Sequence, residues 1–250
     1  MHYAIIAAGQ GSRLRMEGIC APKPLVQLDG DTLIGRLITL MRRQPDCKRI
    51  SVIISPAVSD FAVTAGIDPL PWAGADDVIV ASTPGSMHSL HRLAPHLRQS
   101  ERFCLMTVDT VFRPEDFDAF TAYMRQDTDA DGHMAVTTYI DDEKPLYISA
   151  DTGSWITGYF DTPLPDTRYV SGGIYALPSS SLDVLDDCIR AGMMRMRDFQ
   201  RALVASGMRL RAYQFSRIID IDHAADIDAA LSLIRPKTPA YSSDTDNKPI

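Results

Sequence analysis

Short runs of apolar residues alternate along the first half of the chain with longer segments in which apolar residues recur every three or four positions. The runs lie at 3–8, 50–54, 77–80 and 102–108, and the helically spaced segments lie at 32–43, 60–65 and 87–97. Uninterrupted apolar runs are typical of strands buried on both faces, and parallel strands need long, usually helical, connections. The pattern therefore predicts a βαβαβαβ unit with the right-handed crossovers that such units nearly always adopt.

The second half of the chain continues with segments of both kinds. Helices are expected at 115–126, 181–191, 196–206 and 225–234, strands at 134–140, 169–177 and 210–215, and a hairpin at 147–159. No internal repeat or linker divides the chain, so we expect one α/β domain over residues 1–235, with a mostly parallel, mixed sheet and helices on both faces. Residues 236–250 hold three prolines and few apolar groups, and we expect them to form a disordered tail.

Composition and charge narrow the classes of partner. The chain has 250 residues, 45% of them hydrophobic and 23% charged, and a formal net charge of −7. This acidic balance disfavours nucleic acid and anionic membrane surfaces as partners. No stretch reaches the roughly 18 uninterrupted apolar residues of a membrane helix. The four cysteines form no CxxC pair and no basic leader opens the chain, so we expect a cytoplasmic protein with reduced thiols.

The first apolar run leads directly into a glycine-rich segment, Ala8-Gly9-Gln10-Gly11-Ser12-Arg13. Small residues allow backbone N–H groups to close around phosphate oxygens, and open α/β sheets bind ligands at the carboxyl ends of their strands. Arg13 can add two hydrogen bonds and a positive charge. The segment fits neither the Walker A motif nor the Rossmann glycine motif. A plain glycine turn beside a surface arginine is the alternative interpretation.

A lysine between two prolines, Lys23, follows ten residues after Arg13 in the segment Ala21-Pro22-Lys23-Pro24-Leu25. The prolines fix the backbone and disfavour a helix, so we expect an extended loop that holds the ammonium group in place. Such a lysine on its own is more often a solvated loop residue. Beside a glycine-rich phosphate loop, however, the segment favours a phosphate contact.

Taken together, AAGQGSRL and APKPLVQLDGDTLIGRLITLM are very similar to AAGxGxRL…PKPLxxxxGxPLI, the opening signature of the nucleotidyltransferases that make sugar nucleotides and related activated phosphates. The resemblance implies a Rossmann-like α/β fold. It implies a nucleotide site formed by the glycine loop with its neighbours, namely Ala8, Gly9, Gly11, Ser12, Arg13 and Lys23. In that family the signature arginine and lysine bind the triphosphate and the acceptor phosphate.

Two acidic segments resemble the metal-binding segments of the same family. Asp109 follows an apolar run and fits the family's GDxxF motif, except that Val108 replaces the glycine. Asp220 and Asp222 lie on one face of an extended segment that resembles the family's late DIDTPEDL motif. Carboxylates at strand ends suit Mg²⁺, which takes oxygen ligands. The resemblance therefore implies a Mg²⁺ site of Asp109 with Asp220 or Asp222, while Asp226 is expected at the start of the last helix.

Two further segments carry weaker signals, one for the nucleotide and one for the acceptor. Ser86 lies in an SMHSL segment that looks like the serine-rich loop of small choline-phosphate cytidylyltransferase-like members, where it contacts the nucleotide, and a plain helix cap is equally compatible with it. Gly172 and Gly173 resemble the family's acceptor-binding GIY segment, where absent side chains let a sugar approach the backbone. The family's Glu-Lys-Pro acceptor motif is not recognisable in residues 151–167, which weakens the expectation of a common hexose phosphate.

A methionine-rich segment, Met193-Met194-Arg195-Met196, fits core filling or a contact between subunits. The sequence leaves the oligomeric state open, a homo-oligomer included.

These features predict an enzyme that joins the NMP part of an NTP to a small phosphorylated acceptor, a sugar 1-phosphate or an alcohol phosphate, with release of pyrophosphate. Positioning and charge stabilisation dominate such chemistry, with Arg13, Lys23 and Asp109 in the catalytic roles. Two alternatives stay open. A glycosyltransferase that uses a sugar nucleotide would explain Asp220-Ile221-Asp222 as a DxD motif, and a non-catalytic nucleotide-binding regulatory module would explain Val108 and the missing acceptor motif.

Overall fold

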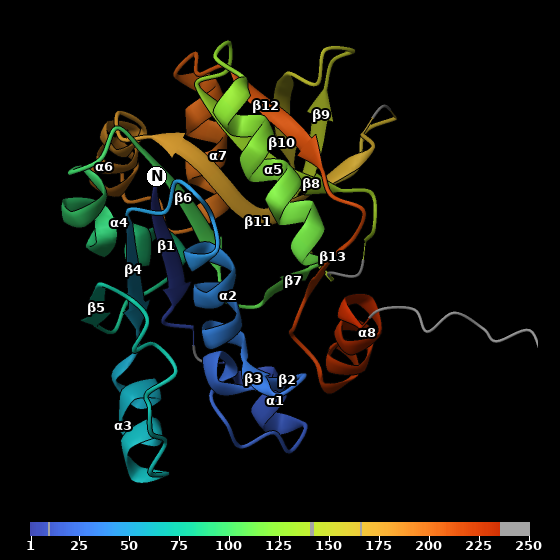
Figure 1. Ribbon diagram of the computed structural model, residues 1–250. Coiled ribbons are helices and arrows are strands. Elements are labelled where there is room, and N and C mark those ends of the chain that lie inside the picture. The colour runs from blue at the N-terminus through green and yellow to red at the C-terminus, as the bar shows by residue number, and fades with distance from the viewer. Residues whose placement is uncertain (10, 141–142, 166, 236–250) are drawn as a thin grey trace, which may run out of the picture.

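The computed structural model describes residues 1–9, 11–140, 143–165 and 167–235 (Figure 1), so the expected tail at 236–250 lies outside the described residues. The strands are β1 His2–Ala7, β2 Gln27–Leu28, β3 Asp31–Thr32, β4 Arg49–Ile54, β5 Asp77–Val80, β6 Arg102–Thr107, β7 Thr110–Phe112, β8 Gly132–Thr137, β9 Tyr147–Ala150, β10 Ile156–Phe160, β11 Tyr169–Pro178, β12 Leu210–Gln214 and β13 Ile218–Asp220. The helices are α1 Ser12–Met16, α2 Leu33–Arg42, α3 Pro56–Thr64, α4 Ser86–Leu97, α5 Pro114–Gln126, α6 Ser181–Arg190, α7 Met196–Ala205 and α8 Ala224–Ile234, with a 3₁₀ turn, η1, at Lys23–Leu25.

One nine-stranded mixed sheet forms the centre of the fold, with the path β10-β9-β11-β6-β1-β4-β5, with β8 beside β11 and β12 beside β8. β1 is parallel to both β4 and β6, and β4 is parallel to β5. β11 runs antiparallel to β6 and joins this parallel half to the later strands. The expected βαβαβαβ unit and the mixed sheet are confirmed.

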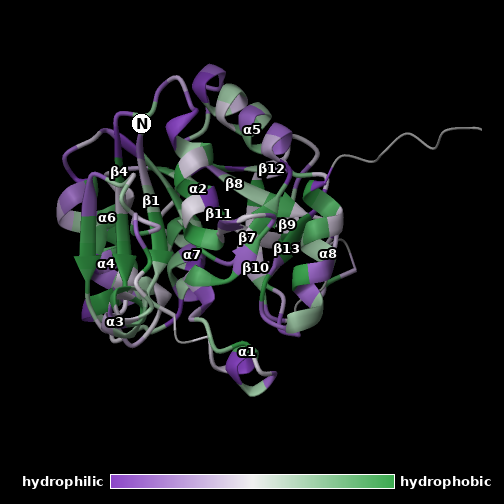
Figure 2. Ribbon diagram, turned by 60° about the horizontal axis from the view of Figure 1, so that its bottom comes forward, coloured by the Kyte–Doolittle hydropathy of each residue, from purple (hydrophilic) through white to green (hydrophobic). Residues whose placement is uncertain are grey.

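Helices cover both faces of the sheet because its central strands are apolar on both sides. Along β1, Tyr3 and Ile5 pack into one core with helices α2, α3, α5 and α8, whereas Ala4 and Ile6 pack into a second core with α4, α6 and α7. All four side chains are at most 6% exposed. In Figure 2, helices α5 and α8 alternate between hydrophobic and hydrophilic positions around their axes, as expected of helices with one buried face.

A two-stranded ribbon outside the main sheet lies at the carboxyl end of the parallel strands. β13 pairs antiparallel with β7, and Asp220 lies opposite Thr110 in their register. The ribbon lies between the sheet and α8 in Figure 1. It brings together residues that are more than one hundred positions apart in the sequence.

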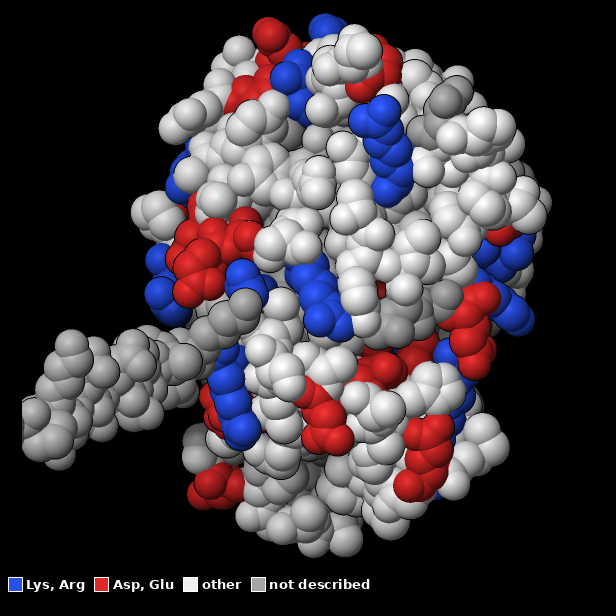
Figure 3. All heavy atoms as spheres, turned by 90° about the vertical axis from the view of Figure 1, so that its right-hand side faces the viewer, with Lys and Arg blue, Asp and Glu red and all other residues white. Residues whose placement is uncertain are grey.

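The differences from the expected elements are local. The strand expected at 134–140 ends at Thr137. Lys23 begins a 3₁₀ turn rather than an extended loop, because Pro22 at the N-cap and Pro24 in the first turn fit the start of a helix, where their missing N–H groups cost nothing. None of the described helices is both long and apolar enough to cross a membrane. Acidic and basic side chains are interspersed over the face shown in Figure 3.

Candidate active site

The glycine loop and the start of α4 line a pocket at the carboxyl end of β1. Ala8, Gly9 and Gly11 form one wall, and Ser86 belongs to the opposite wall. Gly11 has a positive φ of 58°, and a side-chain carbon there would lie 3.0 Å from Cβ of Lys23, so this glycine lets the η1 turn pack against the loop. Gly85, not Ser86, occupies the N-cap of α4, and the cap forms no side-chain hydrogen bond. Ser12 is exposed at the first turn of α1, and Gln10 lies outside the described residues.

Lys23 extends into the floor of this pocket and joins two of the expected carboxylates. Its Nζ donates to Oδ2 of Asp109 at 2.9 Å and to Oδ1 of Asp222 at 2.5 Å. The residue is only 9% exposed. Burial alone lowers the pKa of Lys23, but the two carboxylates outweigh it and raise that pKa above its ordinary value. The ammonium group is therefore a fixed positive charge beside the pocket.

Asp220 lies opposite Thr110, the residue after Asp109, and none of the described basic residues forms an ion pair with it. It accepts a hydrogen bond from Oγ1 of Thr110 at 3.2 Å, and Thr110 and Thr107 share a further hydrogen bond at 2.6 Å. Burial and the negative charge of Asp109 raise the pKa of Asp220 well above its usual range. This carboxylate pair would be stabilised by any positive charge placed between its members.

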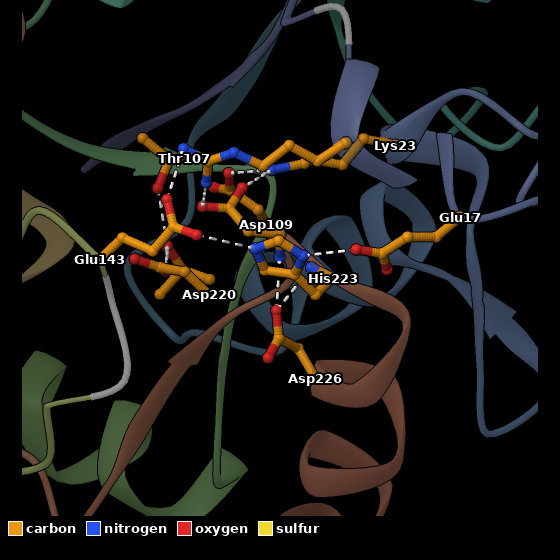
Figure 4. Close-up of polar contacts among 11 residues, drawn as sticks. Glu17, Lys23, Thr107, Asp109, Glu143, Asp220, His223 and Asp226 are labelled. Atoms are coloured by element: carbon orange, nitrogen blue, oxygen red, sulfur yellow. Dashed lines mark hydrogen bonds and ion pairs between the residues drawn. The ribbon is translucent and has the colours of Figure 1, made fainter. Parts of the chain in front are cut away.

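Asp222 is neutralised on its other side by Arg13. The guanidinium lies 3.0 Å from Oδ2 of Asp222 and 3.3 Å from Oε2 of Glu143. Although burial opposes it, hydrogen bonding to Lys23 and the nearby charges lower the pKa of Asp222. Arg13 does not line the pocket of the glycine loop. It lines a neighbouring hollow together with Glu143 and His223, two residues whose side chains point toward one another in Figure 4.

A second pocket meets the first at Asp109, Ser86 and Thr107. Three basic side chains, Lys144, Arg195 and Arg197, line it, and its polar lining includes Ser171, Gly173, Tyr175 and Gln200. Gly173 has a positive φ of 70°, and a side-chain carbon there would lie 2.6 Å from the hydroxyl oxygens of Thr107 and Thr110. The two pockets therefore converge on the carboxylates.

Gly172 lies where the ribbon packs against β11. The space that it leaves open is filled by Ile218, whose Cδ1 would lie 2.2 Å from an added Cβ, and by the carbonyl oxygen of Ala135 at 3.1 Å. Gly172 therefore lets the ribbon pack closely against β11, and its expected contact with the acceptor stays a prediction. Neighbouring residues point to opposite faces of a sheet, so Gly172 and Gly173 make room for different groups.

The structure also reveals site residues that the sequence interpretation missed. Glu143-Lys144-Pro145 lies in the loop before β9, just upstream of the segment 151–167 in which the Glu-Lys-Pro motif was sought. Met194 and Arg195 line the second pocket, so core filling applies only to Met196, which is 8% exposed against 49% for Met194. The Glu143-Lys144-Pro145 tripeptide could have been found from the sequence, because it matches the family motif. The loop between α6 and α7 carries no motif that would have indicated its place in the pocket.

The last helix is fixed to the site by two acidic residues. Asp226 accepts hydrogen bonds from the backbone N–H groups of Asp222 and His223 at 2.9 and 2.6 Å, which confirms its expected place at the start of α8. Glu17, just after α1, accepts from the backbone N–H of Ala224 at 2.6 Å. Both contacts hold the 220–224 segment in place.

A parallel sheet that delivers a glycine loop, a buried lysine and paired carboxylates to one edge defines the class of the nucleotidyltransferases. The profile of the family described as MobA-like NTP transferase domain matches residues 3–166, more than half of the chain. The chain belongs to this family, and it is a nucleotidyltransferase.

Solved structures share the fold over nearly the whole chain. The inositol-1-phosphate CTP transferase from T. maritima is 20% identical with a TM-score of 0.73, over 95% of this chain and 97% of its own. HddC from Yersinia pseudotuberculosis, complexed with GMP-PN, is 20% identical with a TM-score of 0.69, over 92% and 98%. The CMP:2-keto-3-deoxy-manno-octonic acid synthetase complexed with CTP is 17% identical with a TM-score of 0.66, over 93% and 97%. No curated protein sequence matches the chain.

Proposed function

We propose that this protein transfers the nucleoside monophosphate part of an NTP to a small phosphate monoester and releases pyrophosphate. The observation that carries the proposal is Lys23, which lines the first pocket and is held by Asp109, a residue of both pockets, and by Asp222 of the second. An oxygen of the acceptor phosphate attacks the α-phosphorus, the new P–O bond forms, and the bond from the α-phosphorus to the bridging oxygen breaks. That oxygen leaves with the pyrophosphate.

The side chains of this chain supply position and charge for that step. Lys23 lies where it can contact the α-phosphate and the incoming phosphate, and Arg13 is close enough to serve the β- and γ-phosphates. Fixed donors of this kind stabilise the charge that develops in the transition state. The acceptor is already an anion, so the reaction needs no general base.

The carboxylate pair fits a bound Mg²⁺. Asp109 and Asp220 repel one another, and the donor that reaches the carboxylate of Asp220 is a neutral hydroxyl, that of Thr110. Asp222 is paired with both Lys23 and Arg13, whereas Asp109 shares Lys23 alone, so we assign the metal to Asp109 and Asp220. No three His, Cys, Asp or Glu side chains in the described part of the chain could hold a metal by themselves, which suits Mg²⁺ because this ion usually binds one or two carboxylates and takes its other ligands from phosphates and water. When bound, it would withdraw charge from the α-phosphate.

The second pocket favours a polyhydroxylated acceptor over choline phosphate. A quaternary ammonium group is held by exposed aromatic rings, but Tyr175 is the one aromatic residue among the described residues that line this pocket, and it is only 6% exposed. Lys144, Arg195 and Arg197 supply positive charge that can attract the acceptor phosphate, on a lining that also holds Asp109, Asp220 and Asp222. Ser171 and Gln200, joined by a hydrogen bond of 3.0 Å, offer polar partners for hydroxyl groups. We therefore propose a sugar or cyclitol phosphate.

Thermal unfolding with each of ATP, GTP, CTP, UTP and dTTP, with and without Mg²⁺, tests the nucleotide and metal assignments. A nucleotide at 100 times its Kd stabilises the fold by about 2.7 kcal/mol. We expect the Mg²⁺-dependent part of the shift to vanish in Asp220→Asn. Asp222→Asn is the matched control, which we expect to retain Mg²⁺ dependence. Equal loss in both variants would contradict the assignment of Asp220.

Turnover is tested by pyrophosphate release with that nucleotide and a panel of sugar, cyclitol and choline phosphates. Release with a hydroxylated acceptor and none with choline phosphate is the expected result. Nucleotide binding without turnover on any acceptor would instead support a regulatory module. Sugar transfer from a ready-made UDP- or GDP-sugar would support a glycosyltransferase.

A further inference from the structure

One exposed carboxylate in the candidate site, that of Glu143, lies between a guanidinium group and an imidazole ring. Oε2 of Glu143 lies 3.3 Å from NH2 of Arg13, and Oε1 lies 3.6 Å from Nε2 of His223. Figure 4 shows His223 between Glu17 and Glu143. Two nitrogen groups that close on the two oxygens of one anion form the kind of arrangement that binds carboxylates and phosphates.

We propose that Arg13 and His223 form the binding site for the terminal phosphates of the nucleotide and for the leaving pyrophosphate, and that Glu143 occupies this site until the triphosphate displaces it. The proposal rests on the proposed function, since it needs a polyphosphate ligand. It adds His223 as a phosphate contact and assigns Glu143 the role of an internal competitor.

His223 is held in place as a binding residue requires. Its Nδ1 lies 2.6 Å from Oε1 of Glu17, and its backbone N–H donates to Asp226 at 2.6 Å. The ring therefore presents Nε2 toward Glu143 with little freedom left to lose on binding. Glu17 is bound a second time, to the N–H of Ala224 at 2.6 Å, which fixes the carboxylate that orients the ring.

Glu143, in contrast, is held weakly enough to leave. Its side chain is 58% exposed and lies in the loop between β8 and β9. Ion pairs in such exposed positions contribute little to stability. A polyphosphate carries more negative charge than one carboxylate and can contact both Arg13 and His223. Displacement of Glu143 therefore costs little and uncovers both nitrogen groups.

The position of the pair agrees with the metal assignment. Arg13, Glu143 and His223 line one hollow with Asp220 and Asp222. A pyrophosphate held there would lie beside the carboxylate pair, on the side of Asp220 and Asp222 that the pocket of the glycine loop does not reach. Phosphate oxygens in this hollow could then complete the coordination of an ion at Asp220.

Titration calorimetry of the full chain with inorganic pyrophosphate and Mg²⁺ tests the inference without a choice of base or acceptor. We expect His223→Ala to weaken pyrophosphate binding about tenfold, as for loss of one hydrogen bond to a charged group. His223→Gln, which keeps a nitrogen donor near the same place, should recover part of that loss. Glu143→Gln should tighten binding about threefold, because the neutral amide competes less well for Arg13.

His91→Ala is the matched control, since this histidine is also partly exposed and pairs with a carboxylate, Asp186, far from the site. It should leave pyrophosphate affinity unchanged. Unchanged affinity in both His223→Ala and Glu143→Gln, with wild-type circular dichroism, would overturn the inference, as would a wild-type protein that does not bind pyrophosphate. If the variants change pyrophosphate affinity as expected but no acceptor of the panel is turned over, the inference is supported. That result would count against the proposed reaction alone.

Discussion

The two ends of the parallel strands use similar residues in opposite ways. At the amino ends, Asp77 accepts two hydrogen bonds from Arg49, at 2.6 and 2.7 Å, and one from Ser51 at 2.7 Å, and Ser51 also contacts His2 at 2.8 Å. His2 and Ser51 are fully buried. At the carboxyl ends, the charged groups instead line open pockets.

The difference lies in how the charges are satisfied. In the closed cluster the carboxylate has several donors around it, and the hydrogen bonds from Arg49 lower the pKa of Asp77 strongly. In the open cluster one lysine serves two carboxylates, and no basic residue in the described part of the chain forms an ion pair with Asp220. Such unbalanced charge is costly unless a ligand completes it. The first cluster is therefore built for stability, and the second is built to receive an anion and a metal ion.

The sharpest way to test this comparison is Lys23→Ala. We expect turnover, measured as pyrophosphate release, to fall about a thousandfold, because a fixed positive charge at the reacting phosphates is lost. The fold should persist by circular dichroism, since Asp222 keeps Arg13 as a partner. Undiminished turnover would show that Lys23 is not part of the machinery.

At the closed end the expected effect is on stability and on its pH dependence. Burial lowers the pKa of His2 from its ordinary 6.5 to about 4. As the pH falls below 6.5 the unfolded chain takes up this proton while the folded chain does not, so stability falls until the pH reaches about 4. This group should remove about 3 kcal/mol between pH 7 and pH 4.

Urea unfolding across this pH range, for wild type and His2→Gln, measures that contribution. The variant should lose correspondingly less stability on acidification, while its turnover at pH 7 stays near the wild-type value. His91→Gln, at an exposed position, should follow the wild-type curve. Parallel curves for wild type and His2→Gln would mean that His2 is not kept neutral by burial.

The smallest effect concerns a glycine that supports the open end. Gly173→Ala should destabilise the fold by about 2 kcal/mol, because alanine is strained at positive φ and its methyl group would crowd Thr107 and Thr110. Gly192, with a φ of 73° and nothing within 4 Å, is the control for strain alone, and its alanine variant should lose about 1 kcal/mol. If chemical denaturation shows equal losses of stability in the two alanine variants, the contact of residue 173 with Thr107 and Thr110 has no effect on stability.

Elements with a strong pattern could be predicted from the sequence. The apolar runs of β1, β4 and β6 and the helical spacing of α2 and α4 appear where expected. The short elements could not be predicted, because the two or three residues of β2, β3, β7 and β13 are too few to show a period. These short strands include the ribbon that brings Asp220 close to Asp109, so the sequence left the choice between Asp220 and Asp222 open.

The remaining site residues were hidden for a different reason. Glu143 contacts Arg13 and His223, which lie far from it in the sequence, and Arg195 reaches the second pocket from the loop between α6 and α7. Contacts between residues so far apart in the sequence depend on how the layers pack. The spacing of apolar residues along the chain does not indicate them. The motif residues Arg13, Lys23 and Asp109 could be selected because a resemblance, rather than a pattern, pointed to them.

The ribbon of β7 and β13 also determines when a newly made chain can become active. The glycine loop, Lys23 and Asp109 are all made before residue 110, but the ribbon cannot form until residues 218–220 have been synthesised. Until then Lys23 lacks Asp222, and Asp109 lacks its partner carboxylate. A ribosome-bound chain can therefore build its parallel strands early, but it cannot assemble the charged centre until nearly all of the described sequence has emerged.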